Sequence, residues 1–360
     1  MMKKLLSILL TTTIAVLSLT GCGGSAGAAA AAPTASGGNP LKIVTTIFPE
    51  YDWVRNILGE HAADADLTLL VDNGADLHSF QPTADDILTI STADLFVYVG
   101  GESDEWVSDA LKQAVNQDMV VIDLLDVLGE DAKEEEIVEG MDAEHEHGEE
   151  GHDHDEEDGD HDHEDADHDH EDADHDHEEE PELDEHVWLS LRNAVLYCGA
   201  ITDALSKLDP ANADSYAANN AAYQERLTAL DQAYRQAVDA SAEKTLLFGD
   251  RFPFRYLTDD YGLTYYAAFV GCSAETEASF ETVVFLANKV DELSLPVILT
   301  IEGKDHRIAE TIRDNTADKD LKILSMDSMQ SVTASEIAAG ADYLKIMEQN
   351  LEVLKQALAK

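Results

Sequence analysis

Short apolar runs and amphipathic stretches alternate along this chain in two separate series. One series occupies residues 41–129 and the other residues 242–360. The apolar runs have the length of strands, and the amphipathic stretches repeat apolar residues every three or four positions, as helices do. Strands that alternate with helices form mainly parallel sheets covered on both faces. The sequence therefore predicts an α/β fold with two lobes, each a mainly parallel sheet flanked by helices.

The positions of the elements follow from the same pattern. Strands are expected at 41–47, 67–71, 95–99, 119–123, 245–249, 264–269, 297–301 and 322–325. Helices are expected at 50–58, 83–92, 103–116, 187–208, 212–240, 280–293, 306–316 and 335–359. Residues 186–241 form a helical region, and its long helix is expected to join the two lobes. Ligands of open parallel sheets bind beyond the carboxyl ends of the strands, so the cleft between the lobes is the expected site.

The two series are separated by an acidic segment at residues 130–185. It holds 32 of the 75 acidic residues and almost no apolar ones, and the sequence EDADHDH occurs in it twice, at 164–170 and 171–177. Such a composition cannot offset the entropy of ordering, so a disordered loop is predicted. The formal net charge of the whole chain is -53. The remainder of the chain is also acidic, which argues against nucleic acid as a partner.

Most of the histidines lie inside this loop. Ten of the 14 fall there, mainly as His-x-His pairs: His145, His147, His152, His154, His161, His163, His168, His170, His175 and His177. Imidazole suits zinc, copper and nickel better than manganese. We therefore expect an accessory loop that collects or buffers metal at many weak sites. Because neutral imidazole is the ligand, capture should weaken as the pH falls through about 6.5.

The N-terminus has the layout of a secretory signal. Residues 1–21 combine a short basic start with an apolar run that is too short to span a membrane, and Cys22 follows Gly21 directly. This boundary resembles a bacterial lipobox, which makes Cys22 the expected lipidated residue and residues 22–40 a flexible tether. An extracytoplasmic protein held at the cell membrane by its lipid is predicted. Cys198 and Cys272 are expected to be two separate thiols.

Two of the four remaining histidines stand where a site would be built. His78 lies in DLHSFQPT after the second predicted strand, and His186 lies in DEHVWLS where the acidic loop ends. These stretches, followed by RFPFRYLTDDYGL, GCSAETEAS and MDS, resemble in order the motifs of the metal-binding lipoproteins of bacterial zinc and manganese ABC importers. The resemblance covers nearly all of residues 42–360. It implies two α/β lobes bridged by a rigid helix, a metal ion between them, and His78, His186 and Asp327 as ligands.

The third ligand position departs from that pattern. The resemblance implies a histidine or glutamate where this chain has Arg251. A guanidinium is permanently charged and cannot bind a cation. Asp250, paired with Arg251, is the expected substitute. A site with three protein ligands and water, or a contribution from Glu275 or Glu277, remains an alternative.

The expected function is capture of Zn²⁺ in the interlobe cleft and its delivery to the permease of an ABC importer, by a monomer that is not an enzyme. Two imidazoles with one or two carboxylates suit zinc, although Mn²⁺ would remain an alternative cargo in the same family. A metal-buffering surface protein or adhesin is a second hypothesis. A zinc hydrolase is a third, but neither an HExxH motif nor a nucleophile elbow is present.

Overall fold

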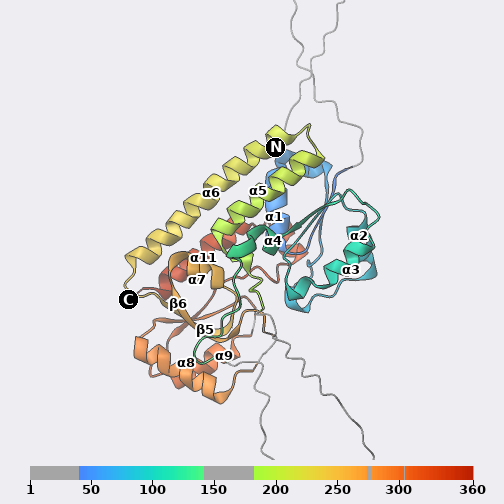
Figure 1. Ribbon diagram of the computed structural model, residues 1–360. Coiled ribbons are helices and arrows are strands. Elements are labelled where there is room, and N and C mark those ends of the chain that lie inside the picture. The colour runs from blue at the N-terminus through green and yellow to red at the C-terminus, as the bar shows by residue number, and fades with distance from the viewer. Residues whose placement is uncertain (1–39, 142–181, 274–276, 304, 360) are drawn as a thin grey trace, which may run out of the picture. The chain divides into compact units, whose positions relative to one another are not determined.

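The computed structural model describes residues 40–141, 182–273, 277–303 and 305–359. The described strands form two four-stranded sheets, ordered β2-β1-β3-β4 and β6-β5-β7-β8. Helices pack around both sheets (Figure 1). Every strand pairing within them is parallel. The α/β class with two mainly parallel sheets, predicted from the alternating pattern, is confirmed.

The first sheet is covered by helices on both faces. Its strands are β1 (Lys42–Thr45), β2 (Asp66–Leu69), β3 (Leu95–Tyr98) and β4 (Val120–Asp123). Its helices and helical turns are α1 (Phe48–Leu58), η1 (Gly59–Asp64), η2 (Leu77–Ser79), α2 (Ala84–Ser91), η3 (Glu102–Asp104), α3 (Trp106–Lys112), α4 (Leu124–Leu128) and η4 (Gly129–Asp131). In β3, Leu95 and Val97 pack into the large core and Phe96 into a smaller one on the opposite face. This two-sided burial is what a central parallel strand requires.

The second sheet repeats the arrangement. Its strands are β5 (Thr245–Phe252), β6 (Thr264–Val270), β7 (Val297–Thr300) and β8 (Lys322–Ser325). Its helices are α7 (Arg255–Tyr261), α8 (Phe280–Leu293), α9 (Arg307–Asn315), α10 (Ala334–Ala338) and α11 (Tyr343–Ala357). The register of β5 against β6 shifts between Phe248 and Arg251. Such irregularities re-aim side chains near sites, and this one lies at the carboxyl end of the strand.

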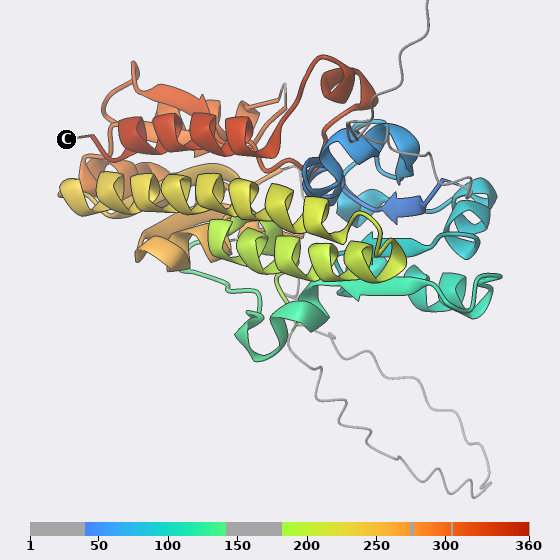
Figure 2. The same ribbon diagram turned by 90° about the horizontal axis from the view of Figure 1, so that it is seen from above.

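A pair of long helices connects the two sheets. The turn η5 (Val187–Leu189) leads into α5 (Leu191–Leu208), and α6 (Ala213–Ala240) runs beside α5 (Figure 2). Helix α6 contacts α1 of the first half and both α7 and α11 of the second. Its 28 residues span roughly 42 Å at 1.5 Å per residue. None of the helices in the described ranges is both long and apolar enough to cross a membrane.

Trp188 fixes the start of this helical region to the second half. Its fully buried indole donates to the carbonyl of Ser328 at 2.8 Å, and the hydroxyl of Tyr343 donates to the carbonyl of Trp188 at 2.6 Å. Tyr343 also packs edge-on against Trp53 of α1. The backbone next to His186 is therefore held by contacts that reach both halves.

The C-terminal helix differs from the prediction. A single helix was expected at 335–359, but the structure has α10 and α11 with a break between them. Gly340 has φ +96°, which is left-handed backbone that a helix interior does not accept. Asp342 then caps α11 by accepting the amide of Lys345 at 3.0 Å. A glycine within a predicted helix, followed closely by an aspartate, therefore marks the end of one helix and the N-cap of the next.

Buried Asp104 provides a test of how the loop after β3 is held. Its Oδ2 accepts the amides of Val99 and Gly100 at 3.0 and 3.1 Å, and burial, with Glu185 and Asp123 nearby, raises its pKa to about 7. A carboxyl whose pKa is raised by folding stabilises the fold fully only below its unfolded pKa, and that stability is lost as the pH rises to about 7. Asp104→Asn should therefore raise the free energy of unfolding at pH 8 by up to about 4 kcal/mol.

Urea unfolding at pH 4.5 and pH 8 measures this effect, with the exposed Asp118→Asn as the control. The gain should be far larger at pH 8 than at pH 4.5, because pH 4.5 lies only slightly above the unfolded pKa of about 3.9 and the folded Asp104 carboxyl is still protonated there. An equal change at both pH values would show that ionisation of Asp104 is not what destabilises the loop.

Candidate metal centre

His78 stands on a helical turn that follows β2. Asp76 begins the turn, because its Oδ1 accepts the amide of His78 at 3.1 Å. Leu77 is fully buried and anchors the turn in the large core. The polar side chain of His78, of which only 11% is exposed, is thereby directed away from the core and toward the second half.

His186 comes from the segment that precedes η5. It is fully buried, and its amide donates to Asp184 Oδ1 at 2.9 Å. Its ring Nδ1 lies 3.0 Å from the same oxygen. An ionised carboxylate only accepts hydrogen bonds, so Nδ1 carries the proton and Nε2 keeps its lone pair.

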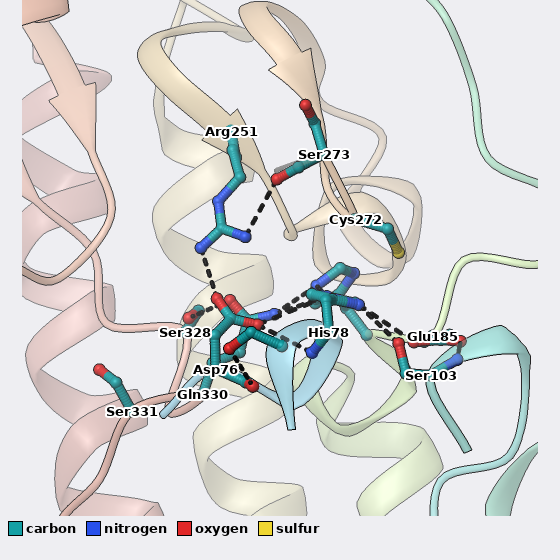
Figure 3. Close-up of polar contacts among 12 residues, drawn as sticks. Asp76, His78, Ser103, Glu185, Arg251, Cys272, Ser273, Ser328, Gln330 and Ser331 are labelled. Atoms are coloured by element: carbon teal, nitrogen blue, oxygen red, sulfur yellow. Dashed lines mark hydrogen bonds and ion pairs between the residues drawn. The ribbon is translucent and has the colours of Figure 1, made fainter. Parts of the chain in front are cut away.

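The two imidazoles meet through their Nε2 atoms, which are 3.2 Å apart. Nδ1 of His78 lies 2.8 Å from Ser103 Oγ and 3.2 Å from Glu185 Oε2 (Figure 3). Burial alone would raise the pKa of Glu185, but His78 and Ser103 lower it below its ordinary value. Each ring is thus backed by a carboxylate and presents Nε2 to the other, which is the usual arrangement of metal-binding histidines.

Gln330 closes the site from the loop after β8. Its amide nitrogen lies 2.7 Å from Nε2 of His186 and 3.0 Å from Nε2 of His78, and its oxygen accepts the hydroxyl of Ser328 at 3.1 Å. An amide NH₂ has two donors, one for each lone pair. A metal ion at the position of this NH₂ group would therefore face the Nε2 lone pairs of both rings.

Cys272 is the third potential ligand near the two rings. One donor atom each of His78, His186 and Cys272 lie within 4.8 Å of one another. Burial raises the pKa of the Cys272 thiol well above its ordinary value, and the carboxylates of Glu135 and Glu185 add to the shift. A cavity of about 240 Å³ adjoins the group, and its lining consists of His78, Glu102, Ser103, Glu105, Glu182, Leu183, Glu185 and Cys272. The approach to the histidines is therefore strongly acidic.

Arg251 ties the loops of the two halves together beside the site. Its guanidinium lies 2.5 Å from Asp76 Oδ2 and donates to the carbonyl of Ser273 at 3.2 Å (Figure 3). Burial by itself would raise the pKa of Asp76, but Arg251 and His78 lower it below its ordinary value. The positive charge of Arg251 is thus neutralised by Asp76 instead of facing the histidines unpaired.

Residues 43–357 match the family model described as "Zinc-uptake complex component A periplasmic". The chain belongs to this zinc-uptake family. Zinc-binding protein AdcA of Streptococcus pyogenes serotype M3 is 30% identical over 324 residues, which cover 88% of this chain and 55% of that protein. High-affinity zinc uptake system protein ZnuA of Bacillus subtilis is 29% identical over 90% of this chain and 89% of its own length. The chain spans about half the length of the AdcA relatives.

Solved structures of zinc-binding proteins resemble the fold of this chain. The Zn(II)-bound ZnuA-like domain of Streptococcus pneumoniae AdcA has a TM-score of 0.64 at 25% identity, over 89% of this chain and 100% of that one. The periplasmic zinc-binding protein TroA of Treponema pallidum has a TM-score of 0.65 at 21% identity, over 90% of this chain and 100% of that one. The second likeness concerns the fold alone.

Asp327 and Asp250, the two carboxylates predicted as ligands from the sequence, accept backbone amides in the structure. Asp327 accepts the amide of Met329 at 2.8 Å, and burial and the charge of Glu302 raise its pKa to about 7. Asp250 accepts the amides of Arg251 and Ile301, at 2.9 and 3.3 Å, and burial raises its pKa. Neither belongs to the group of donor atoms around the histidines. Their assignment as ligands stays a prediction.

Arg251 is paired differently from the prediction, since its guanidinium binds Asp76 and not Asp250. Glu277, an alternative third ligand, is exposed. Cys22, Glu275 and the ten histidines of the acidic loop lie outside the described residues. Cys198 and Cys272 are free, as predicted.

Sequence reasoning missed two residues of the site, Cys272 and Gln330. One signal was available for Cys272, because a Gly-Cys pair begins two residues after a predicted strand ends and carboxyl ends of parallel strands converge. Gln330 lies three residues beyond Asp327, but nothing in its type pointed to a metal.

Proposed function

We propose that this chain captures Zn²⁺ between its two halves and delivers the ion to the membrane permease of an ABC importer. His78 and His186 are the ligands on which the proposal rests, and the 3.2 Å between their Nε2 atoms is the observation that carries it. Two nitrogens bound at 2.0–2.1 Å to one tetrahedral zinc ion are roughly 3.3 Å apart. The rings therefore already stand at the separation that a shared zinc ion needs.

Zinc is favoured over manganese by the donors on offer. Manganese prefers carboxylate, carbonyl and water oxygens, whereas imidazole suits zinc. The relatives at 29–30% identity are named for zinc binding or zinc uptake. For the remaining coordination positions the sequence nominates Asp327 and Asp250, whose carboxylates would have to move toward the histidines, because neither belongs to the group of donor atoms around them.

Anchoring and collection complete the proposal. Lipidation of Cys22 would hold the protein, a monomer, on the extracytoplasmic side of the cell membrane, and residues 22–40 would be its tether. The histidines of the acidic loop would gather ions at weak sites, and Glu182, which lines the acidic cavity, belongs to the same acidic segment of the sequence. Release at the permease would come from local loop displacement, because the long helix α6 contacts both halves and is a stiff bridge.

Metal titration by calorimetry tests the proposal. The full chain should bind one zinc ion tightly and further ions weakly, and a variant with residues 142–181 replaced by a short Gly-Ser linker should keep the tight ion. Excess Mn²⁺ should not displace it. Loss of all tight binding with the loop would instead support the metal-buffering hypothesis, and displacement by Mn²⁺ would make manganese the cargo.

A further inference from the structure

The turn that follows β6 brings a thiol toward the two histidines. This approach depends on Gly271, since a Cβ at that position would lie 2.7 Å from Cε1 and 2.9 Å from Nδ1 of His186. The amide of Cys272 donates to Glu135 Oε1 at 3.1 Å, and the carbonyl of Ser273 accepts Arg251 at 3.2 Å. Cys272 is therefore placed beside the rings by contacts on both sides of the turn.

The distances suit a shared ion. With zinc–nitrogen bonds of 2.0–2.1 Å and zinc–sulfur bonds of 2.3 Å, nitrogen and sulfur ligands of one tetrahedral ion are roughly 3.6 Å apart. The donor atoms of the two histidines and Cys272 lie within 4.8 Å of one another, so Sγ needs to move by about 1 Å at most. Rotation of the side chain can supply that movement, because Cys272 borders the 240 Å³ cavity.

The residues expected at the third ligand position, Arg251 and Asp250, do not belong to the group of donor atoms around the rings. The guanidinium of Arg251 cannot bind a cation and is held by Asp76. Asp250 is held by two backbone amides. In the described part of the chain, Cys272 is the residue that joins the two histidines in a group of potential ligand atoms.

We propose that Cys272 is the third protein ligand of the transported ion and binds it as a thiolate; this inference rests on the proposed zinc site at His78 and His186. When the ion binds, the S–H bond breaks, the proton passes to solvent, and the sulfur electron pair forms the bond to zinc, without any change of oxidation state. A thiolate strengthens the preference for zinc over manganese, because soft sulfur ligands suit zinc and disfavour a metal that prefers oxygen.

Cobalt substitution tests this ligand directly. In the full mature chain with Cys22→Ser, one equivalent of Co²⁺ should give a near-ultraviolet sulfur-to-cobalt charge-transfer band, which histidines and carboxylates do not produce. Cys272→Ser should abolish the band, and Cys198→Ala should keep it, because Cys198 is buried in the core. Loss of a residue that hydrogen-bonds to a metal ligand lowers metal affinity by about 10- to 100-fold. Because Cys272 is proposed as a ligand itself, Cys272→Ser should lower zinc affinity by more than this.

The outcomes separate the two proposals. A chain that binds one Co²⁺ without the band, and loses that ion with His78→Ala and His186→Ala, would overturn the thiolate ligand and keep the histidine site. A band that persists in Cys272→Ser would also overturn it. Binding unaffected by both histidine substitutions would overturn the proposed zinc site itself.

Discussion

Alanine in place of either His78 or His186 should lower zinc affinity by more than about 100-fold. Loss of a residue that only hydrogen-bonds to a ligand already lowers affinity by about 10- to 100-fold, and loss of the ligand itself should lower it further. The effect is large because each ring contributes a lone pair that no neighbour can replace. Both Nε2 atoms face the same point, and Gln330, which also reaches that point, presents an amide nitrogen without a lone pair for a cation. Competition against a chelating dye, in the variant with residues 142–181 replaced, measures the affinity without ions held by the loop.

Matched controls come from the two other histidines of the described chain. His61 packs edge-on against Tyr216, and His306 precedes α9, so alanine at either position should leave zinc affinity unchanged. His186→Gln accompanies His186→Ala, because Asp184 is also buried and needs a polar neighbour. Parental affinity in His78→Ala, with an unchanged near-ultraviolet circular dichroism spectrum, would place the ion elsewhere.

Gly271→Ala should weaken zinc binding although position 271 contributes no ligand. The added methyl would meet the ring of His186 at 2.7 Å and the carbonyl of Phe252 at 3.0 Å. The ring has little room to yield, since His186 is fully buried and held by Asp184. We expect about a 10- to 100-fold loss of affinity, as when a partner behind a ligand is lost, and a stability loss of about 1–3 kcal/mol, as for other overpacked cores.

Gly199→Ala is the control for this substitution. Gly199 lies inside α5, and a Cβ there would meet nothing within 4 Å. Alanine should therefore stabilise the helix by roughly 0.5–1 kcal/mol and leave zinc affinity unchanged. Urea unfolding and zinc titration of both variants give the comparison. If Gly271→Ala bound zinc as the parent does, the turn after β6 would not need its close approach to His186.

Much of the fold could be predicted because each strand is a local apolar run. The run LFVYV predicted β3, and its neighbours in the sheet followed from the alternation with helices. Helix α4 was missed because it begins directly after β4 with no turn between them. Asp123 is both the last residue of β4 and the cap of α4, accepting the amide of Asp126 at 3.0 Å. A continuous apolar stretch conceals such a change of structure.

The site could be predicted only where a sequence motif marked it. His78 and His186 stood in such motifs, and the structure brings their rings together. For Cys272 the sequence offered only its place after a predicted strand, because its approach to His186 depends on how closely the turn packs against a buried ring. The partner of Arg251 likewise depends on a long-range approach, because Asp76 lies 175 positions away in the chain. Side chains that meet only through tertiary packing remain invisible to propensity and spacing.

His78 and His186 are 108 positions apart in the sequence, so an ion shared between them would act as a removable cross-link. A ligand that binds only the folded chain stabilises it by about 2.7 kcal/mol at a free concentration of 100 times its dissociation constant. The bound ion would thus also raise the free energy of unfolding of the protein that holds it. Copies without the ion would unfold more readily than loaded ones, and the amount of intact protein would follow the supply of metal.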